Sequence, residues 1–256
     1  MNKYINPLNL IFLSLSLFSV LACGVEFDPS SLVQEMRVLS IKAEPPEVSP
    51  GSSVTFTPLV TNPSGDPLAY RWMLYGDASF MESPGTSGEP AGDPLFTYEG
   101  EVCTIPIPPD LLVTLGGLES VYVPLVLQVS QGETVRQAFK GLLISENETS
   151  PNRNPRISGI NVNGILPPDL PLPLPSSSPD SDSEIEISVI LDESRIDEGD
   201  EMRYYWYSDS GEFKYNDKQE NTWTAPEEPV STYILAVTRD DRGGTDWFKI
   251  EIEVIP

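Results

Sequence analysis

Short alternations of apolar and polar residues, interrupted by turn-forming residues, are the feature that most limits the fold of this chain. The alternation is clear over residues 53–60, 68–74, 184–191 and 248–254. A period of two residues is typical of β-strands that bury one face. The chain also has 26 prolines, and no stretch beyond the first 22 residues keeps a helical period. The pattern therefore predicts an all-β fold of antiparallel strands.

The pattern repeats in two halves of similar size. Tyr70-Arg71-Trp72 and Tyr204-Tyr205-Trp206 each follow an alternating strand and a turn, and each half ends in a long hairpin. Both tryptophans are expected to pack in a core. We therefore expect two tandem immunoglobulin-like antiparallel β-sandwiches, over residues 36–145 and 156–256, which is the usual size of such domains.

Four segments lack the alternation, two outside these halves and two within them. Residues 23–35 are predicted to form an acidic tether, and residues 146–155 have the polar, proline-punctuated composition of a linker. Residues 83–94 are expected to form an exposed loop. Within the second half, the Pro/Ser-rich residues 166–183 predict an extended polyproline II segment that leads into a disordered one.

The N-terminus has the pattern of a signal peptide over residues 1–22. A basic residue, Lys3, precedes an apolar stretch that ends at Ala22, directly before Cys23. This exit resembles a bacterial lipobox, which implies cleavage before Cys23 and acylation of its thiol. Because Gly24 follows instead of the aspartate that retains many lipoproteins in the inner membrane, the resemblance implies the outer membrane. An ordinary cleaved secretory signal is the alternative.

Charge and composition argue against several classes of function. With a formal net charge of −24, the chain lacks the basic surface that is typical of a nucleic-acid-binding protein. The chain has no histidine and only two cysteines, so Ser-His and Cys-His nucleophile pairs cannot form. We therefore expect a protein that is not an enzyme. Cys103 lies in a β-like apolar run and is expected to be a buried, inert thiol, although a Cys23–Cys103 disulfide stays open if Cys23 carries no lipid.

A group of aromatic residues in the second half is a candidate binding face. Tyr205 and Tyr207 alternate with Trp206 and should therefore lie on the outer face of their sheet, with Phe213 and Tyr215 close behind in the sequence. Exposed aromatic clusters suit stacking on sugars or docking of a protein partner. The alternative is ordinary packing against the long loop or the other domain.

Acidic turns offer weak candidates for a calcium site. Asp240 and Asp241, with Asp197 and Asp200 on another turn, could supply oxygen ligands for Ca²⁺. No loop has the regular acidic spacing of an EF-hand, and Asp-Gly turns are common without metal. We expect no other cofactor or metal.

The second half resembles bacterial immunoglobulin-like or PKD-like repeats. The resemblance rests on Tyr204-x-Trp206, Gly211-Glu212-Phe213, residues 222–226 and residues 240–247, while residues 43–51 after a lipobox are similar to uncharacterised lipoproteins of myxobacteria-like lineages. It implies a fold and a location and carries no activity. The expected function is a lipid-anchored, non-catalytic spacer or protein-interaction module of the cell envelope, with a protein or glycan partner. A carbohydrate-binding surface lipoprotein is the alternative.

Overall fold

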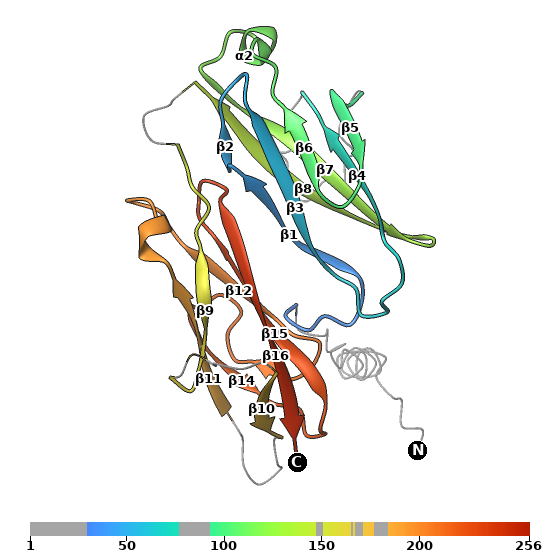
Figure 1. Ribbon diagram of the computed structural model, residues 1–256, viewed down its shortest axis with the longest axis vertical. Helices are drawn as coiled ribbons and strands as arrows, with labels where there is room; N and C mark the ends of the chain where they lie inside the picture. Colours follow the sequence, from blue (N-terminus) through green and yellow to red (C-terminus); the bar gives the residue numbers. More distant parts are fainter. Residues whose placement is uncertain (1–29, 77–92, 147–150, 165, 167–170, 177–183) are drawn as a thin grey trace, which may run out of the picture.

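The computed structural model describes residues 30–76, 93–146, 151–164, 166, 171–176 and 184–256. Within them the expectation of an all-β fold is confirmed, because the only helical elements described are one turn of α-helix and one turn of 3-10 helix. Two β-sandwiches follow one another along the chain (Figure 1). The predicted signal peptide, Cys23 and most of the predicted loop 83–94 lie outside the described residues.

The first sandwich has a three-stranded and a five-stranded sheet, in the orders β1-β3-β6 and β2-β8-β7-β4-β5. A single turn, α2, joins β6 to β7. The elements are β1 (Arg37–Glu44), β2 (Glu47–Val48), β3 (Ser53–Thr61), β4 (Ala69–Leu74), β5 (Phe96–Glu99), β6 (Cys103–Pro106), α2 (Leu111–Thr114), β7 (Ser120–Gln131) and β8 (Thr134–Ser145).

The second sandwich has two four-stranded sheets, in the orders β13-β14-β11-β9 and β10-β16-β15-β12. The 3-10 turn η2 follows β11 and is capped by the carboxylate of Asp192, which accepts from the backbone N–H of Ser194. The elements are β9 (Ile157–Val162), β10 (Leu172–Pro175), β11 (Glu184–Leu191), η2 (Glu193–Arg195), β12 (Arg203–Tyr207), β13 (Glu212–Phe213), β14 (Glu220–Thr224), β15 (Ser231–Arg239) and β16 (Thr245–Ile255).

The two sandwiches share their strand connections except at one edge strand, because β5 pairs with β4 whereas β13 pairs with β14 in the opposite sheet. In each, the first strand pairs antiparallel with a strand of one sheet (β1 with β3, β9 with β11), and a second short strand then crosses to the other sheet. There it pairs parallel with the last strand of the sandwich (β2 with β8, β10 with β16). Two packed sheets of this size, with consecutive strands exchanged between them, form the immunoglobulin-like sandwich that the sequence predicts.

Each sandwich has its own core, built by the alternation seen in the sequence. Along β7, Val123, Leu125, Leu127 and Val129 are all fully buried between the sheets. In the second sandwich, alternate residues of β11 and β16 are buried in the same way. Trp72 in β4 and Trp206 in β12 lie in the two cores, as expected. Trp223 in β14 is also fully buried.

Part of the predicted polyproline loop is a strand. Residues 172–175 form β10, whose residues pair with Ile252 to Ile255 of β16, and Leu174 is buried in the second core. Two prolines are tolerated because β10 is an edge strand, and their missing N–H groups need not serve a second neighbour. The extended backbone was predicted; the pairing was not, because a Pro-Leu alternation reads equally as a free polyproline segment. Residues 167–170 and 177–183 of the same loop lie outside the described part of the chain.

Candidate functional site: the junction between the sandwiches

Asn154, in the segment between the two sandwiches, hydrogen-bonds to both of them. This asparagine is 2% exposed. Its side-chain amide donates to the backbone carbonyl of Ala43 (2.6 Å) and to the carboxylate of Glu44 (2.9 Å), both in β1. Its side-chain oxygen accepts from the backbone N–H of Thr245 in β16 (2.9 Å). A buried amide needs hydrogen-bond partners. Because the partners of Asn154 belong to both sandwiches, this one side chain connects them.

Asn152, two residues earlier, makes a second connection. Its backbone N–H donates to the carboxylate of Glu47 in β2 (2.9 Å), and its side-chain amide approaches Asp240 at 3.5 Å. Asp240 is 5% exposed, and its Oδ1 accepts from the backbone N–H groups of Arg242 (2.9 Å) and Gly244 (2.7 Å). Burial raises the pKa of Asp240 above its usual value, against the opposing effect of these hydrogen bonds. Asp240 therefore organises the β15–β16 turn that meets the linker.

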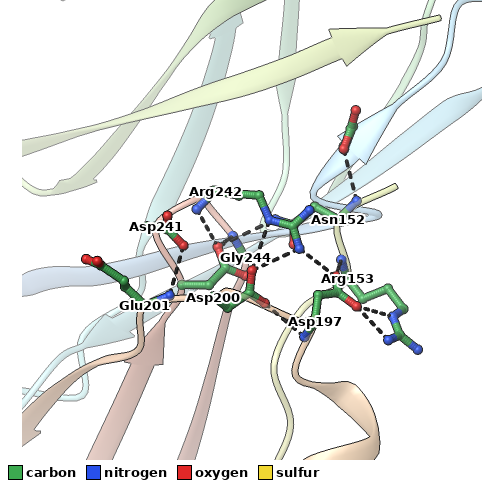
Figure 2. Close-up of polar contacts among 10 residues, drawn as sticks. Asn152, Arg153, Asp197, Asp200, Glu201, Asp241, Arg242 and Gly244 are labelled. Atoms are coloured by element: carbon green, nitrogen blue, oxygen red, sulfur yellow. Dashed lines mark hydrogen bonds and ion pairs between the residues drawn. The ribbon is translucent and has the colours of Figure 1, made fainter. Parts of the chain in front are cut away.

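Two arginines neutralise the neighbouring carboxylates (Figure 2). Arg242 contacts Asp200 at 2.9 Å and Asp197 at 2.8 Å, and Arg153 of the linker donates through Nε to Asp197 at 2.8 Å. Burial by itself would raise the pKa of Asp197, but the hydrogen bonds and charge of Arg153, with the bond from Arg242, hold it below its usual value. The linker, the turn after β11 and the turn after β15 are thus joined by charge-assisted hydrogen bonds.

The calcium candidates lie at this junction, where each of them already has arginine or backbone N–H partners. Asp197 and Asp200 face arginines, Asp240 faces backbone N–H groups, and Asp241 accepts from the backbone N–H of Glu201 (3.1 Å). Within the described ranges, no group of three or more acidic, cysteine or histidine side chains is arranged to hold a metal ion. Sequence reasoning found the cluster of acids but not the arginines that occupy it.

Further polar contacts join β1 and β8 of the first sandwich to the β15–β16 hairpin. Lys42 forms an ion pair with Asp246 (2.8 Å), whose other oxygen accepts from the backbone N–H of Ile157 (2.8 Å). Lys140 donates to the carbonyl of Gly243 (2.6 Å), and Arg239 donates to the carbonyl of Leu39 (2.7 Å). Partners from distant elements therefore fix the hairpin on two sides.

Burial is the main influence on the pKa of Lys140. Burial and, to a smaller extent, the positive charge of Arg239 lower the pKa of this ammonium to about 8, while Asp240 acts in the opposite direction. The same two sandwiches line an open hollow of about 260 Å³, with Ser40, Lys140, Arg239 and Thr245 among its lining residues. The junction thus holds a charged side chain in surroundings that disfavour its charge.

An apolar cluster completes the junction. Val33 and Leu39 from the N-terminal side pack with Leu235 of β15, and the partly buried Leu59, Tyr207, Tyr233 and Trp247 surround them. The N-terminal residues and the first sandwich therefore cover part of the outer face of the β10-β16-β15-β12 sheet, around Leu235. Domains usually move relative to one another unless the interface between them is large and apolar. The interface here has an apolar centre in addition to the polar network described above.

The four aromatic residues of the predicted binding face are not gathered on one surface. Tyr207 packs in the apolar cluster of the junction, and the Tyr205 ring lies 5.0 Å from the guanidinium of Arg239. Phe213 packs on the second core, with its ring 6.0 Å from that of Trp206. Tyr215, 46% exposed, borders a hollow on the other sheet with Glu186 and Glu220. For Tyr207 the alternative, packing against the other domain, describes the structure.

The asparagines of the linker were missed by sequence reasoning. Asn152, Arg153 and Asn154 stand in the run Pro151 to Arg156, which has the composition of an exposed linker. A signal was present only in their spacing, because two amides at i and i+2 of an extended segment point the same way. The partners of the two asparagines lie 88 to 111 residues away in the sequence, so no local pattern identifies them.

Only one of the two cysteines, Cys103, lies among the described residues. Cys103 is fully buried, and burial raises the pKa of its thiol to about 11, which describes the inert thiol that was expected. Cys23 lies outside the described residues, and its acylation stays a prediction. Among the described residues, no helix is both long and apolar enough to cross a bilayer.

Comparison with known proteins adds little to this description. No protein-family model and no curated protein sequence matches the chain. Among solved structures, it is similar to three N-terminal domains of the Highly Immunogenic Outer Capsid protein of bacteriophage RB49 (TM-score 0.27, 12% identity, 86% of this chain and 59% of that one). It is also similar to the N-terminal eight Ig domains of Down Syndrome Cell Adhesion Molecule (0.26, 14%, 87% and 25%). A third is dimeric latent PorU from Porphyromonas gingivalis (0.25, 10%, 86% and 24%). The chain spans less than two thirds of each of them, and scores this low support no functional inference.

Proposed function

We propose that this protein is a non-catalytic spacer of the cell envelope, anchored by lipid at Cys23, which holds two immunoglobulin-like sandwiches as one stiff body. The observation that carries the proposal is the junction, where buried Asn154 hydrogen-bonds to both sandwiches at once. A flexible string of domains would not need buried amides in its linker. A stiff body, in contrast, keeps a surface at a constant distance and orientation from its point of attachment.

The attachment and the partners follow from the sequence. The lipobox-like Ala22-Cys23 would place acyl chains at the N-terminus, and two or more chains suffice for stable attachment to a membrane. Gly24 favours the outer membrane. The net charge of −24 disfavours nucleic acid, which leaves an envelope or extracellular protein, or a glycan, as the partner. Protein docking is the preferred class, because the aromatic residues that would stack on sugars lie apart.

Stiffness is tested by distance measurements between the sandwiches. Spin labels at Glu133→Cys and Glu228→Cys, in a Cys23→Ser chain, report the separation by electron–electron double resonance. We expect a single narrow distribution that broadens in Asn154→Ala, because this change leaves the buried carbonyl of Ala43 and the N–H of Thr245 without their partner, at about 1–3 kcal/mol each. A broad distribution in the unmodified chain would refute the spacer.

The matched control is Asn221→Ala. Asn221 is also a buried asparagine, but its partners all lie within the second sandwich: the backbone of Tyr215 (2.6 and 3.0 Å) and the backbone N–H of Thr222 (2.8 Å). Its loss should destabilise that sandwich without broadening the distance distribution. Anchoring is tested separately, by fractionation and protease treatment of cells that produce the native chain or Cys23→Ser. The native chain should sediment with the outer membrane, and the variant should be soluble.

A further inference from the structure

The residues directly before the first sandwich are attached to the second one. The backbone N–H of Val33 donates to the carbonyl of Ser208 (2.8 Å), and the N–H of Ser208 donates to the carbonyl of Ser31 (3.0 Å). These two bonds form a parallel β-bridge between Leu32 and Ser208, which directly follows β12. The predicted tether is therefore not free over residues 31–33; it adds a short strand segment to the second sandwich.

Side chains hold this segment, which we call the strap (residues 30–33), in place. Ser31 and Val33 are buried, and Val33 packs with Leu39 and Leu235 in the apolar cluster of the junction. Arg37, at the start of β1, donates to the carbonyl of Ser30 (2.8 Å) and to that of Leu32 (3.4 Å). The chain thus runs along the second sandwich before it enters the first.

The position of the strap along the second sandwich determines beside which part of the molecule the preceding chain begins. Ser208 follows Tyr207, which pairs with Leu235 near the middle of β15. The β15–β16 turn that contacts the linker lies at the far end of β15, beyond Arg239. Ser30, two residues before the bridged Leu32, therefore lies beside the second sandwich. The α2 turn lies at the end of the first sandwich that points away from the second sandwich (Figure 1).

Contour length limits how far the anchor can be from this point. Seven residue steps separate Cys23 from Ser30. A fully extended chain spans at most about 3.6 Å per residue, so these steps reach no more than about 25 Å. A lipid on Cys23 would therefore hold Ser30, and the second sandwich beside it, close to the bilayer surface.

We infer that the strap sets the orientation of the molecule: the second sandwich faces the bilayer, and the α2 end of the first sandwich points outward. This inference rests on the proposed anchoring at Cys23. The outward end carries Val113, which is 72% exposed, and Leu118, which is 46% exposed. From chain order alone, the second sandwich would have been the outer one.

Energy transfer to the bilayer tests the orientation. The full-length lipidated protein is reconstituted in phosphatidylethanolamine/phosphatidylglycerol vesicles that contain an acceptor-labelled lipid, with a donor dye at either Val113→Cys or Glu228→Cys. Both positions are exposed, and buried Cys103 should not react. We expect at least a twofold higher transfer efficiency from position 228 than from position 113. Equal efficiencies, or a higher one from position 113, would overturn the orientation while leaving the anchor intact.

A variant at Val33 tests whether the strap sets the orientation. Val33→Asp places a charge in the apolar cluster and should release the strap, so that the difference between the two dyes falls toward zero; the matched control Gln34→Asp, at an exposed neighbour, should keep it. If neither dye transfers energy and the protein does not float with the vesicles, the anchor at Cys23 is wrong instead. In the soluble Cys23→Ser chain, hydrogen exchange at the N–H groups of Val33 and Ser208 should still show protection. Fast exchange at both would overturn the strap itself.

Discussion

Trp72 and Trp206 occupy the same position in the two sandwiches. Each lies in the strand that pairs with the first member of the final hairpin, β4 with β7 and β12 with β15. Each indole is buried, and its N–H donates to a backbone carbonyl, that of Gly100 (2.8 Å) or Lys218 (2.7 Å). A buried tryptophan on this strand is a hallmark of immunoglobulin-like domains, so two copies of one architecture have kept the same central packing element.

Loss of either indole should therefore be costly. We expect Trp206→Ala to lower the free energy of unfolding of the second sandwich by about 3–5 kcal/mol, because it removes a large core side chain and leaves the Lys218 carbonyl without its donor. Chemical denaturation of the Cys23→Ser chain, followed by tryptophan fluorescence and circular dichroism, measures the change. Tyr215→Ala, at an exposed aromatic position, should stay within about 0.5 kcal/mol; similar losses for both would argue against the described core.

Gly244 is predicted to be indispensable for the β15–β16 turn. A Cβ at this position would lie 2.1 Å from Oδ2 of Asp240 and 3.0 Å from the carbonyl of Arg153. Because Asp240 is buried and held by three donors, it cannot easily move away. We expect Gly244→Ala to cost about 1–3 kcal/mol, measured as a lower melting temperature.

The control for this change is Gly76→Ala. There the nearest atom to an added Cβ is the end of the flexible Leu95 side chain, at 3.3 Å. A melting temperature that falls less than half as much as in Gly244→Ala is the expected result. If both variants melt together, the turn tolerates a side chain, and the close approach of the linker to Gly244 is not a constraint.

Calcium is predicted to leave the stability unchanged. The carboxylates of Asp197 and Asp200 already bind Arg242, and Arg153 adds a second positive charge beside Asp197. A divalent cation would have to displace these arginines. Melting curves recorded in millimolar Ca²⁺ and in excess EDTA should therefore coincide. An increase of several degrees with calcium would show that the acidic turns open into a metal site.

The strands were predictable because their information is local. The alternation in β7, β11 and β16 follows directly from which side chains face a core, and the outward direction of Tyr205 and Tyr207 follows from the same period. What covers an outward face is not local. Tyr207 meets Val33 and Leu39, some 170 residues earlier in the sequence, and the linker asparagines meet β1 and β16. A sequence pattern gives the direction of a side chain, but the partner depends on how two finished sandwiches fit together.

Lys140 should make the stability of the junction depend on pH in the alkaline range. Its pKa in the folded chain is about 8, below the value of about 10.4 for an unperturbed lysine. Between these two values the unfolded chain binds more protons than the folded chain, so the free energy of unfolding rises with pH. Below pH 8 Lys140 is charged in both states, and the full cost of burying its charge is present; above pH 10.4 that cost has gone.

The size of the effect follows from the shift, at roughly 1–3 kcal/mol once partial solvent access is considered. Denaturant titrations of the Cys23→Ser chain at pH 7.5, 8.5, 9.5 and 10.5 would show it as an increase in stability across the series. Tyrosines and other lysines also titrate here, so the comparison must be made with Lys140→Met, which keeps the length of the side chain and removes its charge. The difference in stability between the two proteins should shrink or change sign in favour of the native chain as the pH rises. A difference that does not change with pH would mean that Lys140 reaches water when it is charged, and that the junction opens more readily than its hydrogen bond to Gly243 indicates.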